Sequence, residues 1–454
     1  MNDQSKYAGY WWLPRDPEMR IPGALQFSHE QGLILDLSGN LDRKYTEDPR
    51  GFNILGETSF GELVTVYQAI RRSSQYPGAD PTAGESSFIA NKAFIGAHFE
   101  EMDDAQFKSA AFQLNHLDSW LQLEIMDYQY RDSGFSVEYT RPEMLSFNPT
   151  DDIEIRIGFE SVGPNIGAAV TDISFTHRAM LIIELSEVAH FNTFGEILSH
   201  LANLLALAVV TPVNPTRTFA WLPPAENSDE ARPGAKIEVL LPIYRAPQEE
   251  EIHWFDMLFT YKDLEDRFDT FLENWFKKRD TLDPVFDLFF GVLYNLSPYP
   301  ITTFLNYVQA LETYHIRTMS NEVDPPEMHR ERIGRILDAA PTDDRDWLAE
   351  KLGWSNRPAL AHRLKELIDL YPFPVTGQAG SHDAFIKRVR DTRNYYTHYD
   401  PSLEEKAAKG GYLKGLSMTV GSLLEGLVLL ELGFAIEEVK EMQWKRRRLP
   451  SVWF

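Results

Sequence analysis

An arginine and a histidine that could cleave RNA lie in the segment RNYYTH, where Arg393 is followed by Asn394 and, five residues on, by His398. Histidine has a pKa near neutrality, so its neutral ring can accept the proton of a ribose 2′-hydroxyl. Arginine stays charged and can bind the phosphate oxygens as negative charge develops on them. The pair predicts metal-independent cleavage by attack of the 2′-hydroxyl on its own phosphate. DNA, which lacks this hydroxyl, is expected to be inert.

The spacing alone is weakly specific, because chance gives roughly one such pair in a chain of this composition. A second copy indeed exists at Arg357 and His362, with Pro358 directly after the arginine. This second copy is typical of a helix start with a histidine on the surface. The corresponding structural interpretation of the first copy is a surface Arg393 and a His398 that caps a helix carboxyl end.

The first copy lies at the predicted end of a helix over 381–398, which Pro401 closes. Five residues of an ideal helix correspond to about 500° of rotation, so the two side chains would lie about 140° apart. One regular helix therefore does not direct both at one phosphate. Either the helix end is distorted, or a second copy of the chain supplies the missing half, and the second possibility predicts a homodimer with a composite site.

The first half of the chain shows a period of two, typical of strands. In 152–159, isoleucines and a phenylalanine alternate with charged or small residues, and Gly32–Leu37 is a further candidate. Short strands separated by frequent turns predict a sandwich-like or curled antiparallel sheet. We place this β-rich domain at 1–245.

From about Asp256 onward the period changes to 3.6, which predicts amphipathic helices. Asp283 and Pro284 have the pattern of a helix start, with proline at the first helical position. We expect a helical connector over 246–280 and an all-α bundle over 281–454. The predicted fold class is therefore α+β.

Composition and charge restrict the function. The 454 residues include no cysteine, which excludes disulfides and thiolate metal sites and favours a cytoplasmic location. The longest purely apolar stretch covers only 204–210, so no membrane span is expected. Net charge is −24, but residues 381–454 hold 12 Lys/Arg against 10 Asp/Glu, a net of +2. We therefore expect RNA to bind here, with Lys387, Arg388 and Arg390 as candidate contacts.

Phosphate-binding, dinucleotide-binding, zinc-protease and serine-hydrolase motifs are all missing from the sequence. No carboxylate pair stands out by its spacing. The sequence therefore predicts neither a metal site nor a cofactor, and RNA remains the expected partner of the Arg393 and His398 pair.

The segment RNYYTH resembles the motif of HEPN ribonucleases, an arginine separated by four to six residues from a histidine, often with a polar residue after the arginine. The chain as a whole resembles the ApeA family of bacterial anti-phage proteins. The resemblance rests on YWWLP at 10–14, IPGAL at 21–25, FQLNHLDSW at 112–120 and QALETYH at 309–315, in that order.

This resemblance implies that 281–454 is a HEPN domain that cleaves tRNA or other cellular RNA and arrests translation in an infected cell. The N-terminal domain would sense a phage-derived trigger or restrain the nuclease, and HEPN domains would pair two motifs in a dimer. By the same resemblance, Asn394 would assist the catalytic pair. Glu312 and His315 would be supporting residues that line the cleft; the alternative is that they lie on a helix surface with no part in the site.

Two other functions are compatible with the sequence. One is a non-catalytic HEPN-type module for binding or dimerisation, which the three polar residues Arg393, Asn394 and His398 disfavour, since an interface would carry apolar residues there. The other is a β-sandwich ligand-binding protein with a helical dimerisation domain, for which no cluster of ligand-binding residues is seen.

Overall fold

The computed structural model describes residues 5–29, 31–41, 51–75, 84–166, 173–224, 234–242, 252–295, 299–373 and 380–448. The sequence LPPAENSDEARPG at 222–234 indicates a polar, proline-rich loop, and 445–448 is a basic run, KRRR; the first lies partly outside the described residues and the second partly outside the described side chains. The chain divides into two compact units, 1–270 and 271–454. The connector expected at 246–280 is thus shared between them.

Unit 1 consists mainly of strands. These are β1 (Ser5–Leu13), β2 (Asp16–Ser28), β3 (Gly32–Leu37), β4 (Phe52–Thr58), β5 (Leu63–Gln75), β6 (Glu85–Ala90), β7 (Lys92–Ile95), β8 (Gln106–Leu114), β9 (Met126–Arg131), β10 (Gly134–Tyr139), β11 (Leu145–Thr150), β12 (Ile153–Ile166), β13 (Ile173–His190), β14 (Pro215–Trp221) and β15 (Lys236–Leu240). Two helices, α1 (Leu117–Leu121) and α2 (Phe191–Val209), complete the unit. Helix α2 follows β13 directly and packs against β8 and β13.

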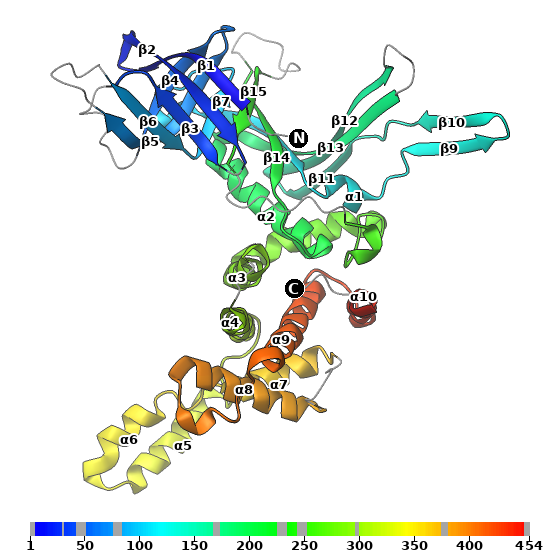
Figure 1. The fold of residues 1–454 in the computed structure, drawn as a ribbon. Helices are drawn as coiled ribbons and strands as arrows, with labels where there is room; N and C mark the ends of the chain where they lie inside the picture. The colour runs from blue at the N-terminus through cyan, green and yellow to red at the C-terminus, as the bar shows by residue number, and fades with distance from the viewer. Residues whose placement is uncertain are drawn as a thin grey trace. The chain divides into compact units, whose positions relative to one another are not determined.

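One 13-stranded sheet contains all of these strands except β9 and β10, in the order β11-β12-β13-β8-β14-β15-β7-β5-β4-β1-β2-β3-β6. An additional β5–β6 pairing closes six of its strands into a barrel (Figure 1). Strand β5 pairs with β4 on both sides of Gln68, whose φ is 52°, while its second partner changes at this residue. Before it Val66 pairs with Ala93 of β7, and after it Ile70 pairs with Ile89 of β6.

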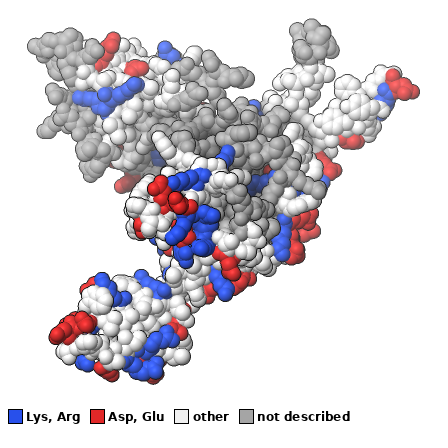
Figure 2. Space-filling model, turned by 60° about the horizontal axis from the view of Figure 1, so that its bottom comes forward, with Lys and Arg blue, Asp and Glu red and all other residues white. Residues whose placement is uncertain are grey.

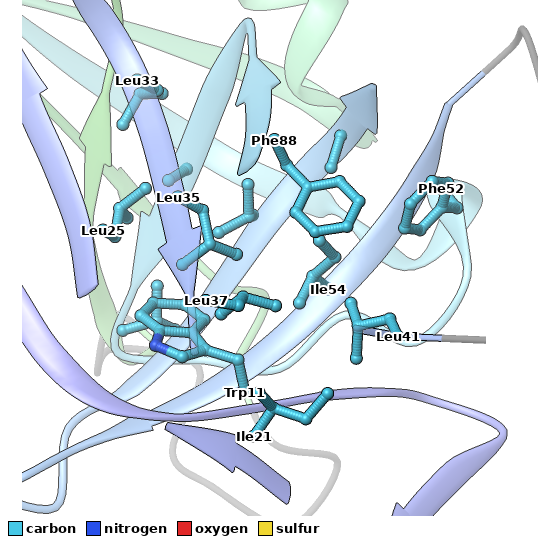
Figure 3. Packing of buried hydrophobic residues seen from close by; sticks show 14 of the residues in the cluster. Trp11, Ile21, Leu25, Leu33, Leu35, Leu37, Leu41, Phe52, Ile54 and Phe88 are labelled. Carbon is cyan, nitrogen blue, oxygen red and sulfur yellow. The ribbon is translucent and has the colours of Figure 1, made fainter. Parts of the chain in front are cut away.

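The interior of this barrel is filled by side chains (Figure 3). Trp11 has no exposed surface and belongs to the same cluster as inward-facing residues of other strands, such as Leu35, Ile54 and Phe88. Gly56 on β4 pairs with Trp11 on β1, and its missing side chain makes room for the indole ring. The period of two over Gly32–Leu37 is therefore the inward–outward alternation of a barrel wall, whereas 152–159 belongs to β12, which lies in the sheet outside the barrel.

Unit 2 is helical (Figure 1). Its helices are α3 (Phe268–Tyr294), which begins at the end of unit 1, α4 (Pro300–Thr318), α5 (Pro326–Ala339), α6 (Arg345–Leu352), α7 (Leu360–Leu370), α8 (His382–His398), α9 (Gly410–Glu431) and α10 (Ile436–Arg448). The α+β class and the helical C-terminal half are confirmed.

The helix start expected at Asp283 and Pro284 is wrong, because α3 runs through Pro284 without a break. A proline inside a helix removes the bond to the carbonyl four residues earlier, here that of Asp280. Arg317 of α4 supplies a replacement, since its Nη1 donates to the carbonyl oxygens of Asp280 at 3.4 Å and Thr281 at 3.3 Å.

Helix α9 forms the core of unit 2. It is the one described helix that is long and apolar enough to cross a membrane, but 61% of its most apolar window is buried within the protein. Two of its glycines accept aromatic rings from neighbouring elements: a Cβ on Gly426 would lie 2.2 Å from the ring of Tyr371, and one on Gly421 2.8 Å from that of Tyr307. This burial is typical of a core helix.

The barrel core gives the first prediction. In Gly56→Ala the new methyl group would lie 2.3 Å from the Trp11 ring, so we expect a loss of about 1–3 kcal/mol in the free energy of unfolding. Gly134→Ala is the matched control, because nothing lies within 4 Å of a Cβ there. Urea unfolding of both variants tests this, and equal stabilities would contradict the packing at Trp11.

Candidate active site

Helix α8 presents the candidate residues on a regular frame. Its start is capped by Ser381, whose side chain accepts a hydrogen bond from the backbone of Ala384. Phe385 and Val389 are fully buried and fix the inward face of the helix. Helical geometry continues through His398, and only Tyr399 leaves it, in a left-handed conformation. The distortion that would bring Arg393 and His398 onto one face is therefore not seen.

Arg393 is held at the half-buried junction of α8 and α4. Its Nη2 donates to Oε2 of Glu312 at 3.4 Å, and its Nη1 donates to Oδ1 of Asn394 at the same distance. The side chains of Arg393 and Glu312 keep 32% and 25% of their surface exposed. Both contacts are longer than the roughly 2.7–2.9 Å of strong charge-assisted hydrogen bonds. The guanidinium is thus oriented, but it can still exchange a partner for a phosphate oxygen.

His398 lies at the exposed last position of α8. Its ring makes no hydrogen bond to the described residues. Asp400 follows two residues later, and hydrogen bonds from Ser402 lower the pKa of this carboxyl, with a smaller contribution from the charge of His398. The imidazole is therefore open to solvent and next to a carboxylate.

Arg393 and His398 make no contact with each other within the described part of the chain. On a regular helix they lie about 140° apart. The single chain thus presents both groups, on different faces of one helix, and does not bring them together.

His315 belongs to a buried polar network instead of lining the surface. It is fully buried on α4, and its ring contacts Nη1 of Arg363 through Nδ1 at 2.8 Å and Oε2 of Glu366 through Nε2 at 2.7 Å. Arginine can only donate, so Nδ1 accepts and Nε2 carries the proton that it donates to Glu366. Both ring nitrogens are engaged in the interior, and the position of His315 is that of a residue holding α4 to α7.

The network reaches the surface through Glu312. Burial lowers the pKa of Arg363, and the carboxylate of Glu312 is the largest influence that opposes this shift. Glu312 therefore interacts with both Arg363 and Arg393. Of the two supporting residues suggested by the sequence, the structure places Glu312 beside the candidate arginine and His315 one layer deeper.

The three candidate RNA contacts are all exposed on α8, but they differ in their surroundings. Lys387 and Arg390 share a band of about 80° with Asn394 and His398, given 100° per residue. Arg390 donates to its neighbour Asp391 at 2.8 Å. Arg388 points elsewhere and donates to the carbonyl of Lys406 at 2.8 Å. Lys387 and Arg390 therefore form a cationic stripe that leads to His398.

Positive and negative side chains are interspersed on the surface shown in Figure 2, and neither sign forms an extended face there. Among the described residues, no group of three or more His, Asp or Glu is placed to hold a metal ion. Positive charge for a phosphate is thus offered locally, along α8.

A cluster of tyrosines next to His398 was not singled out from the sequence. The rings of Tyr395, Tyr396 and Tyr399 lie with centroids 5.0–6.2 Å apart. The signal was present in the sequence, because residues three and four apart on a helix are neighbours.

The second Arg–His pair has the surroundings expected of a surface feature. Arg357 lies over the ring of Trp354 at 3.9 Å, outside α7. His362 is exposed and lies 3.5 Å from Glu366. This pair is therefore a suitable control for the first.

The helical unit and its arginine–histidine helix are matched by a family model: the Apea-like HEPN model covers residues 305–438, which include every candidate site residue. HEPN domains are generally ribonucleases and commonly bind RNA and dimerise. The model of ApeA N-terminal domain 1 covers residues 6–275, more than half of the chain. The chain therefore belongs to the ApeA family. No curated protein and no solved structure matches it.

The buried network gives the second prediction. The hydrogen bond from His315 lowers the pKa of Glu366 below its ordinary value of 4.5. A carboxyl whose pKa is lower in the folded state stabilises the protein above its ordinary pKa, and this contribution is lost as pH falls through the folded value. The stability difference between wild type and Glu366→Gln should therefore be constant near neutral pH and shrink below about pH 4.5. Urea unfolding between pH 4 and 7 measures it, and a difference that grows with acidification would exclude this bond.

Proposed function

We propose that this protein is a metal-independent endoribonuclease of bacterial anti-phage defence, whose active site combines Arg393 and His398 from two copies of the chain. The observation that carries the proposal is the pair on α8: an exposed imidazole and an oriented guanidinium on a regular helix, within a domain matched by a HEPN model. A two-fold axis close to α8 would let Arg393 of one copy face His398 of the other.

The chemistry requires only these two groups and RNA. His398 removes the proton of a 2′-hydroxyl, and the 2′-oxygen forms a bond to the adjacent phosphorus. The bond from phosphorus to the 5′-oxygen breaks, and that oxygen takes a proton from solvent. Arg393 stabilises the charge that builds on the non-bridging oxygens, while Asn394 and Glu312 orient its guanidinium. The products are a 2′,3′-cyclic phosphate and a 5′-hydroxyl.

The proposed substrate is a cellular RNA, with tRNA as the leading candidate, cleaved in the cytoplasm to arrest translation. Lys387 and Arg390 would contact its backbone as it approaches His398. The ApeA N-terminal domain would respond to a phage-derived trigger. The acidity of the remaining chain supports a need for activation, since 1–380 carry a net charge of −26.

The third prediction concerns the two candidate catalytic residues. His398→Ala and Arg393→Ala should each lower RNA cleavage by about 100-fold or more, because each removes one of the two chemical functions. Cleavage is measured on labelled RNA in the presence of EDTA, and the products are analysed for 2′,3′-cyclic phosphate ends.

His362→Ala is the matched control, because it removes the histidine of the second pair, and it should cleave at the wild-type rate. Wild-type activity in His398→Ala would refute the assignment. Activity that depends on added metal would refute the mechanism.

The fourth prediction tests whether the site is composite. Mixing Arg393→Ala with His398→Ala subunits produces hybrid dimers in which one site is intact, if each site takes its arginine and histidine from different copies. Random exchange should restore about a quarter of wild-type activity, since about half of the dimers are hybrids and each has one of two sites. No recovery, with subunit exchange verified by mass, would show that the pair acts within one chain.

A further inference from the structure

We propose that Tyr399, supported by Tyr395 and Tyr396, is a stacking platform for an unpaired nucleobase next to the scissile phosphate, so that the enzyme selects RNA in loops or single strands. This inference rests on the proposed nuclease function and adds the feature of the substrate that the site recognises.

The cluster holds the ring of Tyr399 in place and leaves this residue largely exposed. Tyr396 is anchored by its hydroxyl, which donates to the carbonyl of Ala408 at 3.1 Å. Tyr399 meets Tyr395 at 5.6 Å with an interplanar angle of 60°, and Tyr396 at 6.2 Å with an angle of 86°. These edge contacts hold the ring of Tyr399, yet the residue keeps 61% of its surface exposed.

The backbone at Tyr399 favours a different residue. Its φ of 50° and ψ of 38° are left-handed, and its N–H closes the helix on the carbonyl of Tyr395. Glycine is the preferred residue at this position of a helix end, because a Cβ is strained there. Gln122 has the same geometry after α1, so the strain by itself indicates no function. At residue 399 the strained position carries a large exposed ring, directly after His398, the proposed general base.

The platform lies where a nucleotide of the substrate would pass. Tyr395 precedes His398 by three residues and is its neighbour on the helix surface. The ammonium group of Lys409 lies 5.6 Å from the ring centre of Tyr395 and pairs with the exposed Glu404 at 2.8 Å, a partner that it would exchange for a phosphate beside the stacked base. Exposed aromatic rings that stack on bases, next to cations that contact the backbone, are the combination with which proteins bind unpaired nucleotides. A base inside a duplex is already stacked on both faces and cannot reach the ring.

The experiment is Tyr399→Gly, with Gln122→Gly as the matched control for the backbone and Tyr399→Phe as the conservative variant. Each protein is assayed by steady-state cleavage of a hairpin RNA with an unpaired loop and of a fully paired duplex, together with its melting temperature. Binding of a non-cleavable 2′-O-methyl version of the hairpin is measured in parallel.

Tyr399→Gly should raise KM for the loop, and weaken binding of the 2′-O-methyl hairpin, by on the order of tenfold or more. The kcat should change little and the melting temperature should stay equal or rise, because glycine relieves the left-handed backbone. Tyr399→Phe should retain wild-type KM, Gln122→Gly should cleave normally, and wild type should cut the loop in preference to the duplex.

Wild-type KM and hairpin binding in Tyr399→Gly would overturn the platform, as would equal cleavage of loop and duplex by the wild type. A fall in melting temperature with a matching loss in Tyr399→Phe would also overturn it, by showing a packing role. These outcomes are distinct from failure of the nuclease itself, in which wild type and His398→Ala would be equally inactive.

Discussion

The rotation of an α-helix by about 100° per residue is the constraint on which the candidate site depends. Helix α8 keeps this rotation up to His398, because its inward residues are packed in the core and its end is closed by Tyr399. Arg393 is thereby turned toward Glu312 of α4, while His398 faces solvent. A regular helix thus separates the two groups, and the proposed chemistry follows from joining two such helices.

Interactions around α8 set the position of the arginine. Arg363 is buried and donates hydrogen bonds to His315 and Asn321. The negative charge of Glu312 attracts both Arg363 and Arg393. Two arginines therefore lie near one carboxylate, one inside and one at the surface. The inner one stays fixed by its neutral partners, and this leaves the carboxylate to orient the outer one.

The sequence predicted the features that depend on local pattern and residue type. Alternation over 152–159 predicted strands, and the period of 3.6 after Asp256 predicted helices. Closure of the barrel could not be predicted, because it depends on the change of partner at Gln68 and on pairing between distant strands. The nature and spacing of Arg393 and His398 were readable, whereas the burial of His315 depends on Arg363, which lies 48 residues away. The tyrosine cluster follows from helical spacing, but the left-handed backbone of Tyr399 could not be predicted, because no glycine marks that position.

Proline usually ends or kinks a helix, but α3 continues through Pro284 because a residue of another helix contacts the carbonyl that the proline leaves unbonded. The proline removes one hydrogen bond from α3, and the guanidinium of Arg317 on α4 reaches the carbonyl that is left over. A hydrogen bond that is missing from α3 is thus replaced by a side chain of α4. Residues 284 and 317 are consequently coupled: without the proline the carbonyl of Asp280 would return to the hydrogen-bond ladder of the helix, and without the arginine it would be left to solvent.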